Sequence, residues 1–205
     1  MAESTAQRKP AASNTVALDT HALGTLQYIR ASMDAAGLLA VPGSAGVAMG
    51  AVGLLATLLV ALPAFAPYLF EVWLAAGVVA FLCGSALMVH QALRRGATLY
   101  RGPARRFLLC LAPPLLAGAV LTWTLWRYGV ERMVPGTWLL LYGCAVAAAG
   151  TMTIRPVSVM GGLFVLLGVI TLQLPLSLAN LMLGAGFGGL HLTFGILIGR
   201  MRHGE

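Results

Sequence analysis

The sequence predicts an all-α membrane protein in which six transmembrane helices follow a cytoplasmic amphipathic helix that lies on the membrane surface. Of its 205 residues, 59% are hydrophobic and only 9% are charged, whereas soluble domains are about 25% charged. The apolar residues gather in six stretches that are each about long enough to cross the hydrocarbon layer. Nearly all the charges lie between these stretches, so the net charge of +7 predicts membrane lipids as partners and no nucleic acid.

The N-terminal forty residues precede the first apolar stretch and divide into two parts. Residues 1–15 are polar and small, and we expect a disordered tail. Residues 16–40 predict an amphipathic interfacial helix, because apolar side chains recur every three or four residues at Leu18, Ala22, Leu26, Ile29 and Met33. A short helix packed on cytoplasmic loops is the alternative.

The transmembrane domain is expected over residues 41–200, with residues 201–205 as a cytoplasmic tail. Its spans are predicted at about 44–64, 71–93, 106–126, 137–154, 156–173 and 177–199. The fourth and fifth spans are separated only by Arg155 and Pro156, which predicts a tight turn because proline cannot continue the preceding helix.

The distribution of arginine and lysine predicts the orientation. With the N-terminus inside, 11 of the 13 basic residues fall in cytoplasmic segments and only Arg127 and Arg132 fall outside. In this topology all four tryptophans lie at the outer ends of spans, where amphipathic rings prefer to sit. We therefore expect both termini in the cytoplasm.

The sixth span carries the candidate ligand-binding residues His191 and Asn180. On a helical wheel they share one stripe, about 100° wide, with the candidate helix-packing residues Gly184, Gly188, Gly195 and Gly199. Glycines spaced in this way let another helix approach closely in lipid, so the stripe should face protein. At this depth His191 either forms part of a binding site or pathway, or ties helices together as a hydrogen-bonded neutral imidazole.

Pro113 and Pro114 interrupt the third span and are further candidates for the binding site. They remove two amide donors, so the carbonyls of Leu109 and Cys110 lose their usual partners and one of them could pair with His191. The alternative is an irregularity in packing that a neighbouring Ser or Thr satisfies.

The loop after the second span carries five arginines, which are candidates for fixing topology and for binding anionic lipid headgroups. They are Arg94, Arg95, Arg101, Arg105 and Arg106.

The sequence contains no nucleophile with a nearby base, no metal-ligand cluster and no paired carboxylates, so we expect neither an enzyme nor a cofactor. The three cysteines lie singly in different spans and are expected to be small buried apolar residues. Haem ligation by His90 and His191 is disfavoured, because the two would differ in depth by roughly 8 Å.

Two segments of the chain are similar in sequence. Residues 41–50 and 134–143 share Val-Pro-Gly and a final Gly. The two segments lie three spans apart, as they would in a protein made of two inverted halves of three spans each. Pro-Gly is also an ordinary way to begin a helix.

Three segments carry a resemblance to known proteins: YIRASMDAAGLLAVPG at 28–43, IRPVSVMGG at 154–162 and GFGGLHLTFGILIGRMRHG at 186–204. With these segments the chain resembles a group of six-span bacterial inner-membrane proteins that has no assigned activity. The resemblance implies a bacterial inner membrane and supplies neither a catalytic residue nor a substrate.

The leading functional hypothesis is a non-enzymatic membrane protein that binds or passes a small solute or lipid within the helix bundle. The alternative is a structural or regulatory subunit whose glycine stripe docks a partner membrane protein or a second copy of the chain. A membrane-embedded haem-binding redox subunit is the least favoured.

Overall fold

The computed structural model describes residues 23–30, 42–94, 103–151 and 153–203, with backbone alone at 92, 103–108 and 202–203. The chain forms two units, residues 1–35 and 36–205. In the first unit residues 23–30 are helical and every side chain among them is exposed. The rest of the predicted interfacial helix over 16–40 lies outside the described residues, as does the predicted tail over 1–15.

The second unit contains six helices that are long and apolar enough to cross a membrane, as in a multi-pass membrane protein. They are α2 (Gly43–Ala61), α3 (Leu69–Arg94), α4 (Pro103–Arg127), α5 (Val134–Gly150), α6 (Arg155–Gln173) and a sixth made of three consecutive pieces. These pieces are α7 (Ala179–Leu183), the π-helical segment η4 (Gly184–Leu190) and α8 (His191–His203). No strand occurs over the described ranges, so the all-helical class and the number of apolar helices are confirmed.

The chain reverses tightly between α5 and α6. The helix α5 ends at Gly150, a few residues before the expected boundary, and Ile154 is extended, with φ −121° and ψ 147°. Pro156 lies in the first turn of α6, where its fixed φ is compatible with a helix and its missing N–H costs nothing.

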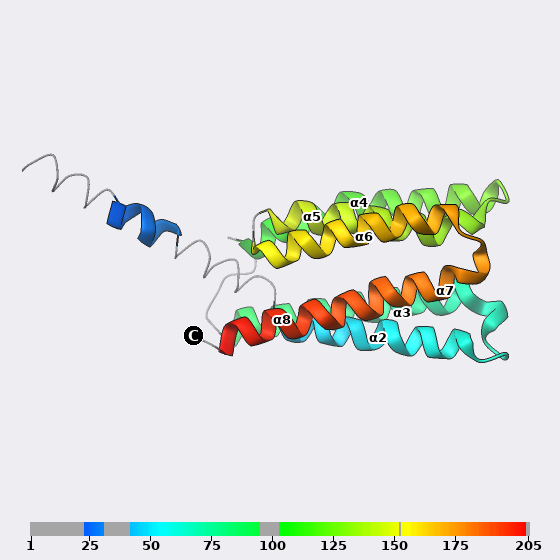
Figure 1. Ribbon diagram of the computed structural model, residues 1–205, viewed down its shortest axis with the longest axis horizontal. Helices are drawn as coiled ribbons and strands as arrows, with labels where there is room; N and C mark the ends of the chain where they lie inside the picture. Colours follow the sequence, from blue (N-terminus) through cyan, green and yellow to red (C-terminus); the bar gives the residue numbers. More distant parts are fainter. Residues whose placement is uncertain (1–22, 31–41, 95–102, 152, 204–205) are drawn as a thin grey trace, which may run out of the picture. The chain divides into compact units, whose positions relative to one another are not determined.

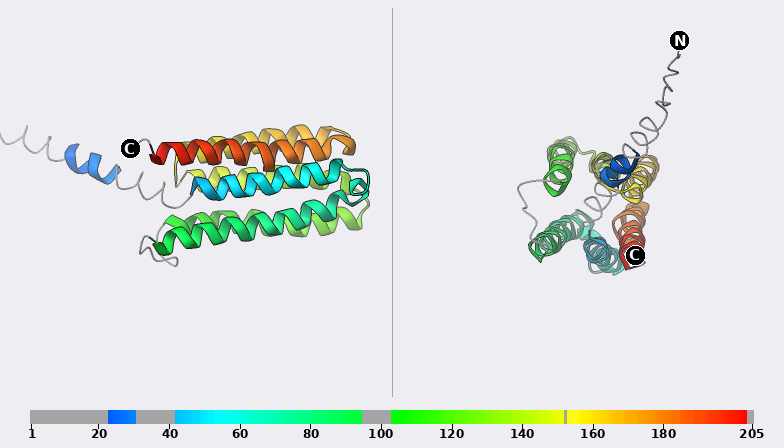
Figure 2. Two further views of the ribbon diagram at one scale, coloured as in Figure 1. Left: turned by 90° about the horizontal axis from the view of Figure 1, so that it is seen from below. Right: turned by 90° about the vertical axis from the view of Figure 1, so that its left-hand side faces the viewer.

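The six helices form two layers (Figure 1). One layer holds α3, α2 and α8 in that order, and the other holds α4, α5 and α6. The end-on view in Figure 2 shows that α6 and α8 join the layers along one side. Along the other side α3 and α4 meet through an edge-to-face contact of Phe70 with Trp126, with ring centroids 5.2 Å apart.

This order excludes the inverted halves. Such halves would match α2 with α5, α3 with α6 and α4 with the last span. Because matched helices run in opposite directions, a twofold axis in the membrane plane would relate them, and it would reverse their order around the ring. The observed ring runs α3, α2, α8, α6, α5, α4, so matched helices follow in the same sense. The sequence similarity between residues 41–50 and 134–143 therefore does not reflect a structural repeat.

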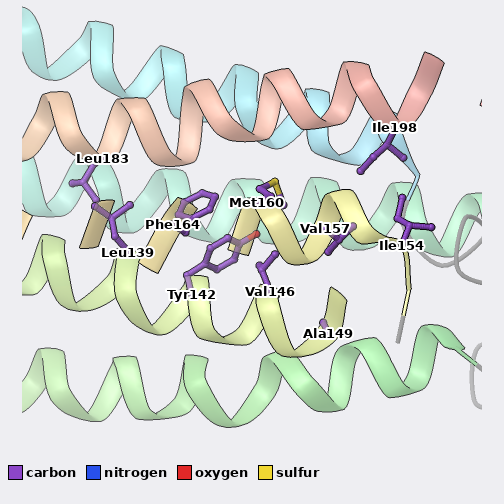
Figure 3. Packing of buried hydrophobic residues seen from close by; sticks show 10 residues of the cluster. All are labelled: Leu139, Tyr142, Val146, Ala149, Ile154, Val157, Met160, Phe164, Leu183 and Ile198. Atoms are coloured by element: carbon purple, nitrogen blue, oxygen red, sulfur yellow. The ribbon is translucent and has the colours of Figure 1, made fainter. Parts of the chain in front are cut away.

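Buried side chains concentrate where α5 and α6 face the sixth span (Figure 3). The cluster includes Leu139 and Phe164, which are both fully buried, and Leu183 and Ile198 from the sixth span. By contrast, only 6% of the most apolar 18-residue stretch of α3 is buried, and the same share of that of α4. These two helices therefore present most of their apolar surface outward, as suits helices in contact with lipid.

Candidate functional site

His191 lies near the middle of the sixth helix and inside the bundle. Only 3% of its surface is exposed, and it is the first residue of α8, directly after the π-helical segment. An ionisable side chain at this depth in a membrane is costly unless it has polar partners. Its surroundings therefore decide whether it has more than a packing role.

The hydrogen-bond partner of His191 is Tyr142 on α5. The distance from Tyr142 Oη to His191 Nε2 is 2.7 Å, and both side chains are buried. Since no other acceptor for the hydroxyl proton is found among the described residues, we assign Tyr142 as the donor. The neutral imidazole then carries its proton on Nδ1.

The second ring nitrogen is not satisfied in the same way. Nδ1 of His191 is buried and makes no hydrogen bond with the described part of the chain. The backbone carbonyls of Gly186 and Phe187 interact with the ring, but neither reaches hydrogen-bond geometry with Nδ1. A buried polar atom without a partner lowers the stability of the folded state. Such an atom is therefore unusual in a region whose side chains serve only to pack helices together.

Aromatic rings surround the pair. The centroid of Phe164 lies 5.0 Å from that of Tyr142 and 5.2 Å from that of His191, both in edge-on geometry. Phe187 stacks on the imidazole at 6.1 Å. These contacts hold the Tyr142 hydroxyl and the imidazole in fixed orientations inside an apolar shell.

The π-helical segment Gly184–Leu190 brings the backbone of the sixth helix close to both layers. A Cβ on Gly186 would lie 2.6 Å from Leu139 Cδ2, and one on Gly188 would lie 2.8 Å from Leu54 Cδ2. Side chains at these positions would require the two leucine side chains to move, so the sixth helix packs closely on α5 and α2. Short π-helical turns occur frequently at functional sites, and this one sets the position of His191.

A cavity of about 80 Å³ begins at the Tyr142–His191 pair and extends toward the end of the bundle where α2 begins and α8 ends. We call this end the basic end, because Arg94, Arg155 and Arg200 lie there. Its walls are mainly apolar, and no charged side chain from the described part of the chain lines it. All six helices contribute lining residues: Pro42, Ala45, Gly46, Met49, Phe81, Gly84, Ser85, Met88, Leu111, Tyr142, Val146, Val157, Met160, His191, Phe194, Gly195 and Ile198.

Asn180 belongs to a different polar group. Trp73 Nε1 donates to Asn180 Oδ1 at 3.0 Å, and Asn180 Nδ2 donates to the carbonyl of Thr57 at 3.1 Å. Eleven residues separate Asn180 from His191, about 16 Å along the helix. Asn180 therefore links the sixth helix to α2 and α3, and it does not line the cavity.

Pro113 and Pro114 do not join His191 either. The helix α4 runs through both prolines, Pro113 is exposed and Pro114 is half-buried. Leu111 lines the cavity and the prolines do not. The partner of His191 is thus the Tyr142 hydroxyl and not a carbonyl freed in the third span.

The stripe of glycines faces α2. A Cβ on Gly184 would meet the side chain of Thr57, and one on Gly195 would lie 2.5 Å from the amide nitrogen of Val47. No atom of the described residues lies within 4 Å of a Cβ on Gly199, although the backbone of Gly199 lies against Gly43. The stripe is therefore covered by a helix of the same chain.

The arginines expected to bind lipid headgroups are only partly described. Arg94 is exposed at the end of α3, and Arg105 and Arg106 lie in the first turns of α4 with backbone alone described. Arg95 and Arg101 lie outside the described residues.

The cysteines differ from expectation. Cys83 and Cys144 are exposed and Cys110 is partly exposed. Apolar surface in a membrane is covered by lipid, so a cysteine there needs no place in the core.

The described residues contain no group of three or more His, Cys, Asp or Glu side chains that could hold a metal ion. His90, the other candidate for haem, is exposed on α3 and does not line the cavity. Comparisons with models of protein families, with curated proteins and with solved structures gave no match to this chain.

Tyr142 is the residue of this candidate site that sequence reasoning missed. One signal was available, because Tyr142 is the only tyrosine inside any of the six predicted spans. A tyrosine hydroxyl far from the membrane surface needs a polar partner, as does His191.

Proposed function

We propose that this chain is a non-enzymatic membrane protein that binds a small, neutral, mainly apolar molecule in the cavity beside Tyr142 and His191, and holds or passes it there. One observation carries the proposal: a cavity with apolar walls ends at a buried hydroxyl–imidazole pair. Binding sites for small molecules commonly combine apolar walls with a few fixed polar groups. A pair that only tied α5 to α8 would not need a cavity beside it.

The described residues that line the cavity carry no charge, which supports a neutral ligand. A charged group placed there would lose its hydration without gaining an opposite charge. The hydroxyl of Tyr142 and the edge of His191 can instead orient one polar atom of an otherwise apolar molecule.

A role as a partner-docking subunit has less support. In that hypothesis the glycine stripe of the sixth helix receives a partner protein or a second copy of the chain, yet α2 of the same chain already covers Gly184 and Gly195. A partner would have to use the outer faces of α3 and α4, which suit lipid equally well.

We also propose a bacterial inner-membrane location, with both termini and the N-terminal amphipathic helix on the cytoplasmic side. The excess of basic residues at one end supports this orientation. So do the tryptophans at the opposite end, where Trp123 and Trp126 are 72% and 51% exposed.

The test is native mass spectrometry of the whole protein extracted in mild detergent. We expect a retained non-lipid mass or one enriched lipid species, which is lost in His191→Ala and in Tyr142→Phe. The matched control is His90→Ala, because this histidine is exposed and does not line the cavity. Chains that carry no ligand, or a mass that survives both cavity substitutions, would overturn the proposal.

A further inference from the structure

We infer that the cavity opens sideways between α3 and α4 into the hydrocarbon of the bilayer, so that its ligand is a hydrocarbon-rich molecule dissolved in the membrane. This inference rests on the proposed function and names its ligand class and its route. The competing route is from water at the basic end.

The cavity is closed toward the basic end. Pro42, Val157 and Ile198 line it there; Pro42 directly precedes α2, and the other two residues lie in α6 and α8. Pro42 is less than 2% exposed, Val157 is 1% exposed and Ile198 is 3% exposed. A solute arriving from water at that end would have to displace three packed apolar side chains.

The open side lies between the two outermost helices. Phe81 of α3 lines the cavity and is 51% exposed. Ser85 and Met88 of α3 and Leu111 of α4 also line it and are half-buried. Gly46 and Met49 of α2 and Phe194 of α8 are half-buried in the same way, so among the described residues that line the cavity the exposed one is Phe81, on α3.

The same two helices are held together far from this opening. The contact of Phe70 with Trp126 joins them near the end opposite the basic end. Phe70 is fifteen residues from Ser85, about 22 Å along α3. Ser85 is also nine residues, about 14 Å, from the end of α3 at Arg94, so the opening lies at the depth of the hydrocarbon.

The lining matches a hydrocarbon ligand in chemistry and in size. Met49, Met88 and Met160 contribute flexible, polarisable side chains that adapt to irregular apolar shapes. A dry cavity of about 150 Å³ accommodates benzene, so 80 Å³ takes only one end of a larger molecule. The rest of that molecule would lie in the opening between α3 and α4, with a polar atom near Tyr142.

The experiment uses the full chain in phosphatidylcholine vesicles and two photoreactive probes. One is the methyl ester of a fatty acid that carries a diazirine near its carboxyl end, and the other is a small water-soluble diazirine. After illumination, adducts are mapped by peptide mass spectrometry. Adducts on lipid-facing residues such as Leu82 and Leu116 show that the photochemistry worked in each sample.

We expect the lipid-dissolved probe to label Met49 or Tyr142 inside the cavity at least five-fold more than the water-soluble probe does. Ser85→Trp should reduce this labelling several-fold by filling the opening. Ala86→Trp is the matched control, because Ala86 is the next residue of the same helix and is exposed away from the cavity.

Each outcome decides the route. Cavity adducts from the water-soluble probe, or lipid-probe adducts confined to outward-facing residues, would overturn the sideways opening. Equal effects of the two tryptophan substitutions would do the same. Native mass spectrometry separates this failure from that of the proposed function, since a retained mass with no sideways labelling rejects the route alone. Sideways labelling of chains that retain no mass would reject the proposed function and leave the sideways opening in place.

Discussion

Two glycines in one stripe give a sharp prediction about how the sixth helix is held against α2. Adding one methyl group at Gly195 should destabilise the protein, whereas adding it one turn later at Gly199 should not. Both residues lie in α8, and both substitutions are glycine to alanine, so only the surroundings differ.

The structure sets the magnitude. A Cβ on Gly195 would lie 2.5 Å from the nitrogen of Val47 and 2.8 Å from the carbonyl carbon of Gly46. Ordinary contacts begin near 3.4 Å, and backbone atoms cannot move aside alone, so the helices must separate by about 1 Å. Overpacking of this kind costs about 1–3 kcal/mol. A Cβ on Gly199 would have no atom of the described residues within 4 Å, and the higher helix propensity of alanine is worth up to about 1 kcal/mol.

The assay is reversible unfolding by sodium dodecyl sulfate in mixed micelles, followed by far-ultraviolet circular dichroism. We expect Gly195→Ala to lower the free energy of unfolding by about 1–3 kcal/mol, and Gly199→Ala to leave it unchanged or raise it. Equal effects of the two variants would refute the close packing of α2 on α8.

Tyr142→Phe should lower the free energy of unfolding by about 1–2 kcal/mol, because it leaves His191 Nε2 unsatisfied. The double variant Tyr142→Phe/His191→Leu should recover part of this loss. Strictly additive effects in this double-mutant cycle would contradict the hydrogen bond. Asn180→Ala removes two hydrogen bonds and should lower the free energy of unfolding by about 1–2 kcal/mol in the same assay. It should leave any mass retained in native mass spectrometry unchanged. Loss of that mass would show that Asn180 belongs to the binding site. A fluorescent protein fused after Glu205 should fold and fluoresce, and alkaline phosphatase inserted at Gly129 should be active, whereas the opposite pattern would reverse the orientation.

The sequence by itself determined the elements that depend on local chemistry. In a bilayer, backbone groups find no water, so each apolar stretch must satisfy its own hydrogen bonds as a helix. The six apolar stretches therefore predicted six helices, and Pro156 predicted the reversal between the fourth and fifth. The stripe around His191 also predicted that this residue faces protein, because glycines on one face of a membrane helix allow another helix to approach.

Only the tertiary structure decided which helix faces which. Tyr142 pairs with His191 across 49 positions of sequence because α5 and the sixth helix face each other within the bundle. Asn180 shares the stripe of His191 but lies three turns away, where Trp73 and Thr57 reach it. Helix order and rotation in lipid depend on many small packing energies and on few polar contacts, which no local pattern encodes. The cavity, and the side on which it opens, follow from that order.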